Sequence, residues 1–334
     1  MKKVRIGIIG MGRIGKIHYE NLKNKIENVD VVSFSDPFFT EMLEIPNVDV
    51  ESLVSSDLVD AVIICSPTNT HADYISLCAK YKKDVFCEKP HDLSLSRVME
   101  SLNEVKKSGI KLMLGFNRRF DPNFLKIKKL VVEGKIGNPF LVKITSRDPS
   151  PPSLNYLISS GGMFLDMTIH DFDMARYIMG KEVKEVYAVA GAFVSEEVAR
   201  ANDIDTAVVT LKFEDGTMAL IDNSRKAVYG YDQRLEIFGS GGMAKVENNN
   251  HDTHTLYNES GAHSSLPLDF FMDRYTSSYL NEAKNFIYAI QTNSDVAITG
   301  DDGLEALKIG IAAGISAKEN RPVKIEEISQ LQYT

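Results

Sequence analysis

The chain has 334 residues, 43% of them hydrophobic and 25% charged, with a formal net charge of −8 at pH 7. These values are typical of a soluble globular protein that is long enough for two domains, each with its own core. The acidic balance argues against nucleic acid or an anionic membrane surface as the main partner. No apolar run approaches the length of a membrane span, and no signal peptide is recognisable before the first expected strand.

The three cysteines, Cys65, Cys78 and Cys87, are odd in number and show no C-x-x-C spacing. This pattern argues against a disulfide framework and against a zinc site. We therefore expect reduced, mostly buried thiols and a cytoplasmic location.

The first expected element is a buried parallel strand at residues 4–9, a short apolar run. It leads into Gly10–Gly15, which matches G-x-G-x-x-G, and residues 16–22 are expected to be helical. This is the context in which the motif binds a dinucleotide. The first glycine permits a tight turn, the second lets a pyrophosphate approach the backbone, and the third allows close packing of helix on strand.

A second strand is predicted at residues 29–35, and it ends at Asp36, about 20 residues beyond the last glycine as the fingerprint requires. A carboxylate there accepts hydrogen bonds from both ribose hydroxyls of NAD and repels the 2′-phosphate of NADP. The alternative is an acid that only initiates the loop before Pro37. Residues 38–44 are expected to form about two helical turns, and residues 50–55 a further short turn.

Further buried strands are expected at residues 60–65 and 84–88. Polar loops follow them, at the strand ends where open α/β sheets bind ligands. Ser66 and Pro67 are candidates to line the nicotinamide ribose. Asn69 and His71 lead into the next helix, where His71 is equally suited to cap or pack that helix.

Lys89 follows the second of these strands and precedes a proline, so its backbone is directed away from helix. Its amine is a candidate to hydrogen-bond a substrate hydroxyl or to lower a nearby pKa. The alternative is a surface lysine, which is the commoner fate of a single lysine. Glu88 is expected to pair with the cofactor or with Lys89.

The stretch Ser159–Asp173 carries the second candidate group. If it is helical, Asp166 and His170 lie four positions apart on one face. A carboxylate one turn from an imidazole can orient it as a proton-transfer base. An ordinary solvated Asp–His pair and a metal site that adds Asp173 are the alternatives.

A last strand of the first half is expected at residues 110–116, and the domain boundary after residue 117. An amphipathic helix is predicted at 123–133, and helices at 279–291 and 303–318 close the chain. Strands predicted at 183–194, 204–213, 217–226 and 231–238 alternate as in an antiparallel sheet with one covered face. The expected fold is α/β, with a dinucleotide-binding Rossmann domain at 1–117 and an α+β domain at 118–334 that carries a large, mainly antiparallel open sheet.

These motifs together resemble the glucose–fructose oxidoreductase / inositol dehydrogenase family of NAD(P)-dependent dehydrogenases, over almost the whole chain. Glu-Lys-Pro followed by the Asp-x-x-x-His pair is quite specific for that family. Within it, residues 115–121 and 144–149 are similar to the inositol 2-dehydrogenase branch. The resemblance rests on Gly10–Gly15, Cys65–His71, Cys87–Pro90 and Gly161–His170.

The resemblance implies a catalytic triad of Lys89, Asp166 and His170, and a homo-oligomer, expected to be a tetramer. We expect oxidation of myo-inositol to scyllo-inosose with NAD as hydride acceptor, with His170 as general base and no metal. At the cofactor we expect Gly10, Met11, Gly12, Arg13, Ile14, Gly15, Asp36, Ser66, Pro67, Asn69, His71, Glu88 and Lys89. At the substrate we expect Lys89, Asn117, Arg118, Asp166, His170 and Tyr231.

Several alternatives stay open at this point. The first is a dehydrogenase for another inositol epimer, such as scyllo-inositol, or for a sugar, possibly with NADP. A non-catalytic NAD-binding regulator is the second, although it would have no use for a proton-transfer set. The third is a metal-dependent hydrolase, which leaves the glycine motif unexplained.

Overall fold

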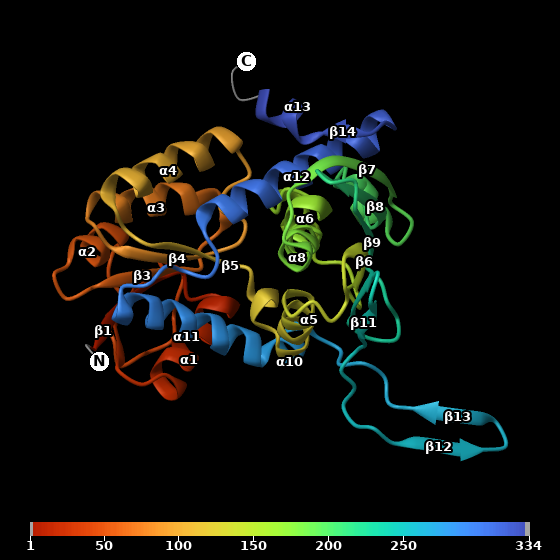
Figure 1. The fold of residues 1–334 in the computed structure, drawn as a ribbon. Helices are drawn as coiled ribbons and strands as arrows, with labels where there is room; N and C mark the ends of the chain where they lie inside the picture. Colours follow the sequence, from red (N-terminus) through yellow and green to blue (C-terminus); the bar gives the residue numbers. More distant parts are fainter. Residues whose placement is uncertain (1–2, 331–334) are drawn as a thin grey trace. The chain divides into compact units, whose positions relative to one another are not determined.

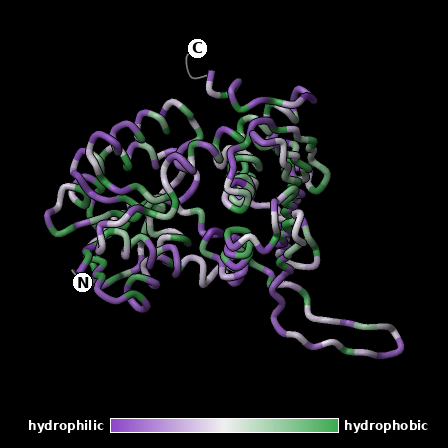
Figure 2. The backbone as a smooth tube through the Cα atoms, viewed as in Figure 1, coloured by the Kyte–Doolittle hydropathy of each residue, from purple (hydrophilic) through white to green (hydrophobic). Residues whose placement is uncertain are grey.

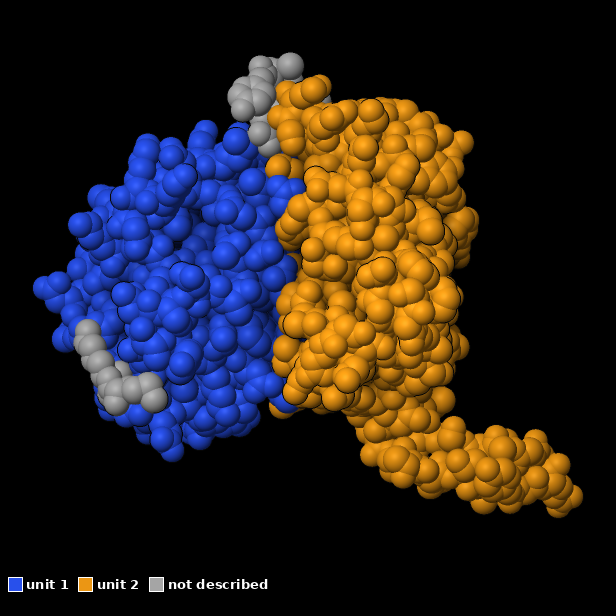
Figure 3. All heavy atoms as spheres, in the orientation of Figure 1, with its two compact units in different colours: residues 1–120, 277–307 blue, residues 121–276, 308–334 orange. Residues whose placement is uncertain are grey.

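The structure is a computed structural model that describes residues 3–330, and the chain divides into two compact units (Figure 3). The first unit contains residues 1–120 and 277–307, and the second contains residues 121–276 and 308–334. The chain thus returns to the first unit after the second has begun, which the sequence analysis does not anticipate. Among the described residues, no helix is long and apolar enough to span a membrane.

The first unit is built on a parallel sheet in the order β2-β1-β3-β4-β5. Its core strands are almost fully buried, as their continuous apolar runs require. Because all five strands run in the same direction, the loops after β1, β3 and β4 lie at one edge of the sheet. The strands are β1 (Val4–Ile9), β2 (Val29–Ser35), β3 (Ala61–Ile64), β4 (Asp84–Glu88) and β5 (Leu112–Gly115).

Helices cover both faces of this sheet (Figure 1). On one face α1 and α11 lie side by side, where the rings of His18 and Tyr279 are 6.0 Å apart. The other face is covered by α2, α3 and α4, and the outer turns of α4 are mostly hydrophilic (Figure 2). The elements are α1 (Arg13–Lys25), α2 (Val50–Ser55), η1 (Thr68–Thr70), α3 (His71–Lys80), α4 (Leu95–Ser108), η2 (Asn117–Phe120), α11 (Thr276–Thr292) and the first part of α12 (Gly300–Glu319).

The helix expected at residues 38–44 is absent, so that prediction is wrong. The Asp36 carboxylate accepts a hydrogen bond from the backbone N–H of Phe38 at 2.9 Å, and the Asp36 N–H donates to the Asn47 side chain at 3.1 Å. These local bonds offer the backbone an alternative to helix. The short helix expected at 50–55 is confirmed as α2.

The second unit contains a seven-stranded sheet in the order β11-β10-β6-β9-β8-β7-β14. All its pairs are antiparallel except β6–β9, and the alternating burial of β8 shows that one face is covered. This agrees with the expected mainly antiparallel sheet, although β6, β11 and β14 were not predicted. The strands are β6 (Pro139–Arg147), β7 (Val183–Gly191), β8 (Thr206–Phe213), β9 (Met218–Ser224), β10 (Asp232–Gly239), β11 (Gly242–Val246) and β14 (Val323–Lys324).

Helix α8 packs on β6, and Ser316 of α12 accepts a hydrogen bond from the backbone of β7 at 2.9 Å. A separate hairpin of β12 (Thr255–Asn258) and β13 (Gly261–Ser264) projects from this unit (Figure 1). The helices are α5 (Pro122–Val132), α6 (Leu154–Ser159), α7 (Met163–Asp166), α8 (Ile169–Met179), α9 (Glu196–Arg200), α10 (Phe271–Arg274), the remainder of α12 and α13 (Ile325–Gln330).

Candidate functional site

The glycine loop after β1 has the geometry that a dinucleotide requires. Gly10 has a φ of +88°, and a Cβ there would lie 2.7 Å from the backbone of Cys65. At Gly15 a Cβ would lie 2.0 Å from the carbonyl oxygen of Gly10. At Gly12, in contrast, no atom lies within 4 Å of the Cβ position, and no side chain caps the start of α1. The loop therefore leaves open space and helix N–H groups for a pyrophosphate.

Asp36 holds this loop from the end of β2. Its Oδ2 accepts a hydrogen bond from the backbone N–H of Met11 at 2.8 Å. The carboxylate is thus fixed beside the glycine loop, at the position where the fingerprint places the acid that binds the ribose.

The polar loop after β3 is fixed by its own side chains. The hydroxyls of Ser66 and Thr70 lie 2.7 Å apart, and Thr70 also donates to the carbonyl of Pro67 at 2.7 Å. Asn69 lies within η1, and its carbonyl oxygen is 3.4 Å from the Arg97 guanidinium. The loop therefore presents a defined edge beside the glycine loop.

His71 joins this loop to the one that follows β4. It is 1% exposed, and its ring nitrogens lie 2.8 Å from the carbonyl oxygens of Ser66 and Pro90. The pKa of His71 is lowered from its ordinary value, because the effect of burial outweighs that of the two carbonyls, which raise it. Of the two roles considered for this residue, the geometry favours packing: His71 would contribute to a cofactor site by holding two loops in place.

Lys89 follows β4, and its peptide bond to Pro90 is cis. Since β3 and β4 are parallel neighbours, Lys89 lies at the same sheet edge as Ser66 and the glycine loop. The carboxyl ends of the strands are where open α/β sheets bind ligands, so an amine here lies at the candidate cofactor edge.

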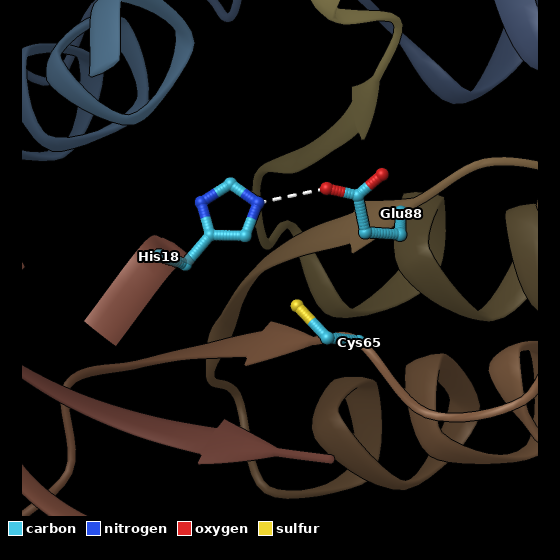
Figure 4. A group of neighbouring side chains, drawn as sticks. All are labelled: His18, Cys65 and Glu88. Atoms are coloured by element: carbon cyan, nitrogen blue, oxygen red, sulfur yellow. Dashed lines mark hydrogen bonds and ion pairs between the residues drawn. The ribbon is translucent and has the colours of Figure 1, made fainter. Parts of the chain in front are cut away.

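Glu88 contacts His18 rather than an open site (Figure 4). Its Oε1 lies 2.7 Å from Nε2 of His18, a residue of α1 that is fully buried. With Cys65 these two residues form the only group in residues 3–330 whose ligand atoms are near enough to suggest a metal. The direct contact between the His18 ring and the Glu88 carboxylate accounts for their proximity without an ion. Burial and Glu88 also raise the pKa of the Cys65 thiol well above its ordinary value.

Glu282 of α11 completes this buried cluster, and sequence reasoning did not identify it. It is fully buried, and neither carboxylate oxygen has a hydrogen-bond partner. Burial, followed by the nearby Glu88, raises the pKa of Glu282 well above its usual range. Such surroundings favour the protonated form of a carboxyl group. No pattern near residue 282 signals this role, because the cluster forms only when α11 packs on the sheet.

The second unit carries Asp166 and His170, but not on one continuous helix as expected. Helix α7 ends at Asp166 and α8 begins at Ile169. Between them, the N–H groups of Met167 and Thr168 both donate to the carbonyl of Met163. The geometric argument from four-residue helical spacing therefore does not hold here. The three ligands of the metal alternative, Asp166, His170 and Asp173, are not among the described residues whose ligand atoms lie close enough together to hold an ion.

Two residues that the sequence analysis missed contact the Asp166 carboxylate. The Tyr156 hydroxyl donates to Oδ1 at 2.8 Å, and Nη2 of Arg225 lies 3.5 Å from Oδ2. Arg225 is 1% exposed and also lies 3.8 Å from Asp203. An arginine at the end of a predicted strand was a weak signal, and Tyr156 offered none.

The remaining predicted substrate residues are buried. Asn117 and Arg118 lie in η2 of the first unit, 3% and 4% exposed. Tyr231, 6% exposed, precedes β10 in the second unit and makes an edge-on ring contact with Tyr275 at 6.0 Å. The first unit thus brings together the glycine loop, Ser66, Pro67 and Lys89, and the second holds Asp166 and His170.

Comparison with known proteins identifies both halves of the chain. Residues 4–116 match the NAD-binding Rossmann fold of the oxidoreductase family, and residues 124–245 match the GFO/IDH/MocA C-terminal domain. The first match agrees with the open glycine loop, so the chain carries an NAD-binding Rossmann domain.

Full-length relatives agree with both matches. Myo-inositol 2-dehydrogenase of Thermotoga maritima is 50% identical, with 97% of this chain and 99% of that protein covered. Inositol 2-dehydrogenase of Rhizobium meliloti is 42% identical, with 96% and 99% covered. The crystal structure of scyllo-inositol dehydrogenase from Lactobacillus casei, with bound NAD(H) and scyllo-inositol, superposes with a TM-score of 0.91 at 31% identity, covering 97% of this chain and 100% of that one. The chain therefore belongs to the GFO/IDH/MocA family of NAD-binding oxidoreductases.

Proposed function

We propose that this oxidoreductase oxidises myo-inositol to scyllo-inosose with NAD. The observation that carries the proposal is the similarity along the whole chain to two proteins named for inositol 2-oxidation, at 50% and 42% identity. The described glycine loop supports the cofactor, and the free cysteines Cys65, Cys78 and Cys87 support a cytoplasmic location.

In this proposal NAD, when bound at the glycine loop, would supply the acceptor for the hydride that leaves the carbon of the reacting hydroxyl. His170 removes the hydroxyl proton as general base, and Asp166 orients the imidazole and supports its basicity. Lys89 hydrogen-bonds the reacting oxygen and stabilises the negative charge that develops on it. Asn117, Arg118 and Tyr231 bind the other hydroxyls of the ring; the planar guanidinium of Arg118 offers several donors for a polyol.

We also propose that the protein is a homo-oligomer, expected to be a tetramer, assembled through the sheet of the second unit. The uncovered face of this sheet exposes large apolar side chains, which single soluble subunits rarely gather in one patch. Val189 and Val208, paired across β7 and β8, are 56% and 47% exposed. The other members are Phe140, Tyr187, Met218, Phe238 and Met243, each between 37% and 51% exposed.

The assay that tests the proposal is NADH formation with purified protein, NAD and a panel of myo-inositol, scyllo-inositol and common sugars, with NADP in parallel. We expect reduction of NAD with myo-inositol and formation of scyllo-inosose. Activity confined to scyllo-inositol would favour the alternative that the 31%-identical structure with bound scyllo-inositol supports. NAD binding without reduction by any substrate would contradict the enzymatic proposal and favour a regulator.

A further inference from the structure

Each oxygen of the Asp166 carboxylate contacts a different side chain of the second unit. Tyr156, on α6, donates its hydroxyl proton to Oδ1 at 2.8 Å. Arg225, which follows β9, brings Nη2 to 3.5 Å from Oδ2. The two oxygens therefore have different partners from different segments of the chain, and rotation of the carboxylate would break both contacts.

Arg225 is itself held between two acids. Its Nη2 lies 3.8 Å from Asp203, whose other oxygen accepts a hydrogen bond at 2.9 Å from the backbone N–H of Met163, the first residue of α7. Arg225 ranks among the largest fully buried side chains, so its charge requires close acidic partners. Asp203 thus fixes both the start of α7 and the guanidinium that faces the end of α7.

The backbone around Asp166 makes such anchors necessary. Helix α7 has only four residues, and it ends at Asp166 before the interruption that precedes α8. A residue at the end of so short a helix receives little orientation from the helix itself. The side-chain contacts therefore determine where the carboxylate points.

We propose that Tyr156 and Arg225 are positioning residues that fix the Asp166 carboxylate, so that it can orient His170. The proposal rests on the proposed dehydrogenase function for its catalytic consequence, but the anchoring itself does not. The other charged groups that bear on Tyr156, Asp166 and Arg225 are Asp203 and Asp148. Burial, followed by the Asp166 charge, raises the pKa of Tyr156, so its hydroxyl remains a donor throughout the assay range.

The decisive variant is Tyr156→Phe, which removes one hydroxyl and keeps the ring. Without that donor the Asp166 carboxylate becomes more basic, and its pKa should rise by about one unit. This shift can be followed by infrared titration of the carboxylate bands in protein labelled with 13C-aspartate, with Asp166→Asn identifying the band. Tyr257→Phe is the matched control, because Tyr257 is 78% exposed on the hairpin.

The kinetic readout separates positioning from a structural role. We expect kcat of Tyr156→Phe to fall about tenfold with KM within about twofold of wild type, because the lost contact serves proton transfer and not ring binding. The more basic carboxylate stabilises protonated His170, so the acid limb of the kcat/KM profile should move to higher pH. Arg225→Lys, which keeps the buried charge, should retain the fold and show the same changes less strongly, because a positive charge remains beside Asp166.

An unchanged Asp166 titration in Tyr156→Phe would overturn the anchoring. A shifted titration with unchanged kcat and pH profile, in a wild type that oxidises inositol, would overturn the orienting role. If the wild type oxidises no inositol, the proposed function fails, and the infrared titration still decides whether Tyr156 anchors Asp166.

Discussion

Lys89 is the single residue on which the proposed chemistry depends most directly. Lys89→Ala should lower kcat with myo-inositol by at least about a hundredfold, because it removes the group that stabilises charge on the reacting oxygen. NAD affinity, measured by calorimetry, should stay near that of the wild type, since the glycine loop and Asp36 are untouched. Retained turnover would contradict the role of Lys89, and lost NAD binding would assign it to the cofactor site.

Glu282 gives a prediction about stability rather than catalysis. Its pKa in the folded chain is raised, whereas in the unfolded chain it ionises near pH 4.5. Below that pH both states hold the proton, but as the pH rises the unfolded state loses it first, and the free energy of unfolding falls. Glu282→Gln removes this loss.

The stability of Glu282→Gln relative to the wild type should therefore increase with pH. We expect the difference between their free energies of unfolding to grow between pH 5 and pH 8 by up to about 1 kcal/mol per pH unit. Urea unfolding at several pH values measures it, with the exposed Glu259→Gln as control. A difference that is independent of pH would show that Glu282 is ionised in the folded protein.

Two glycines in the strand–loop–helix segment from β1 to α1 differ in the space around them: a Cβ fits at Gly12 but not at Gly15. Gly12→Ala should leave the melting temperature within about 2 °C of wild type, because nothing lies within 4 Å of the new methyl group. The same methyl group would occupy the space that a pyrophosphate needs, so NAD binding should weaken at least about tenfold. Gly15→Ala should lower the melting temperature clearly, because its Cβ would lie 2.0 Å from the Gly10 carbonyl oxygen. If Gly12→Ala and Gly15→Ala changed the melting temperature and the NAD affinity equally, the two glycines would not have the separate roles that we assign to them.

Helices and strands could be predicted from the sequence where the local pattern of residues and the packing in the folded chain favour the same structure. Strands β1 and β2 are buried apolar runs bounded by glycine or an acid, and both were predicted with their observed bounds. The segment 38–44 had helical length, but the side chains of Asp36 and Asn47 direct its backbone elsewhere. Strand β6 was missed because lysine, threonine and serine interrupt its apolar pattern.

The residues of the candidate site also fall into those that the sequence could identify and those that it could not. The residues of the glycine loop, Asp36 and Lys89 were identifiable because short motifs encode them. Tyr156, Arg225 and Glu282 were not, since each acquires its role from a partner distant in sequence: Tyr156 from Asp166, Arg225 from Asp166 and Asp203, Glu282 from Glu88. No local spacing records such contacts.

For the whole molecule, the exposed apolar sheet face makes the assembly testable. Val208→Lys places a charge at the centre of that face, so the desolvation of an unpaired ammonium should oppose association. We expect sedimentation velocity to show a smaller species than the wild type, with the secondary structure retained. Val228→Lys, at a site 83% exposed and outside the strands, is the control. Identical sedimentation of Val208→Lys and wild type would place the interface elsewhere.

The return of residues 277–307 to the first unit has a consequence for synthesis of the chain. Phe286 of α11 packs on Phe86 of β4 with ring centroids 5.8 Å apart, and the carbonyl of Ile298 accepts from the N–H of Leu114 at 3.3 Å. These core partners leave the ribosome long after the sheet they cover, with the whole segment 121–276 emerging between them. The apolar strands of the first unit would therefore remain incompletely covered until residues 277–307 have been synthesised, and it is during this interval that chaperones would be needed.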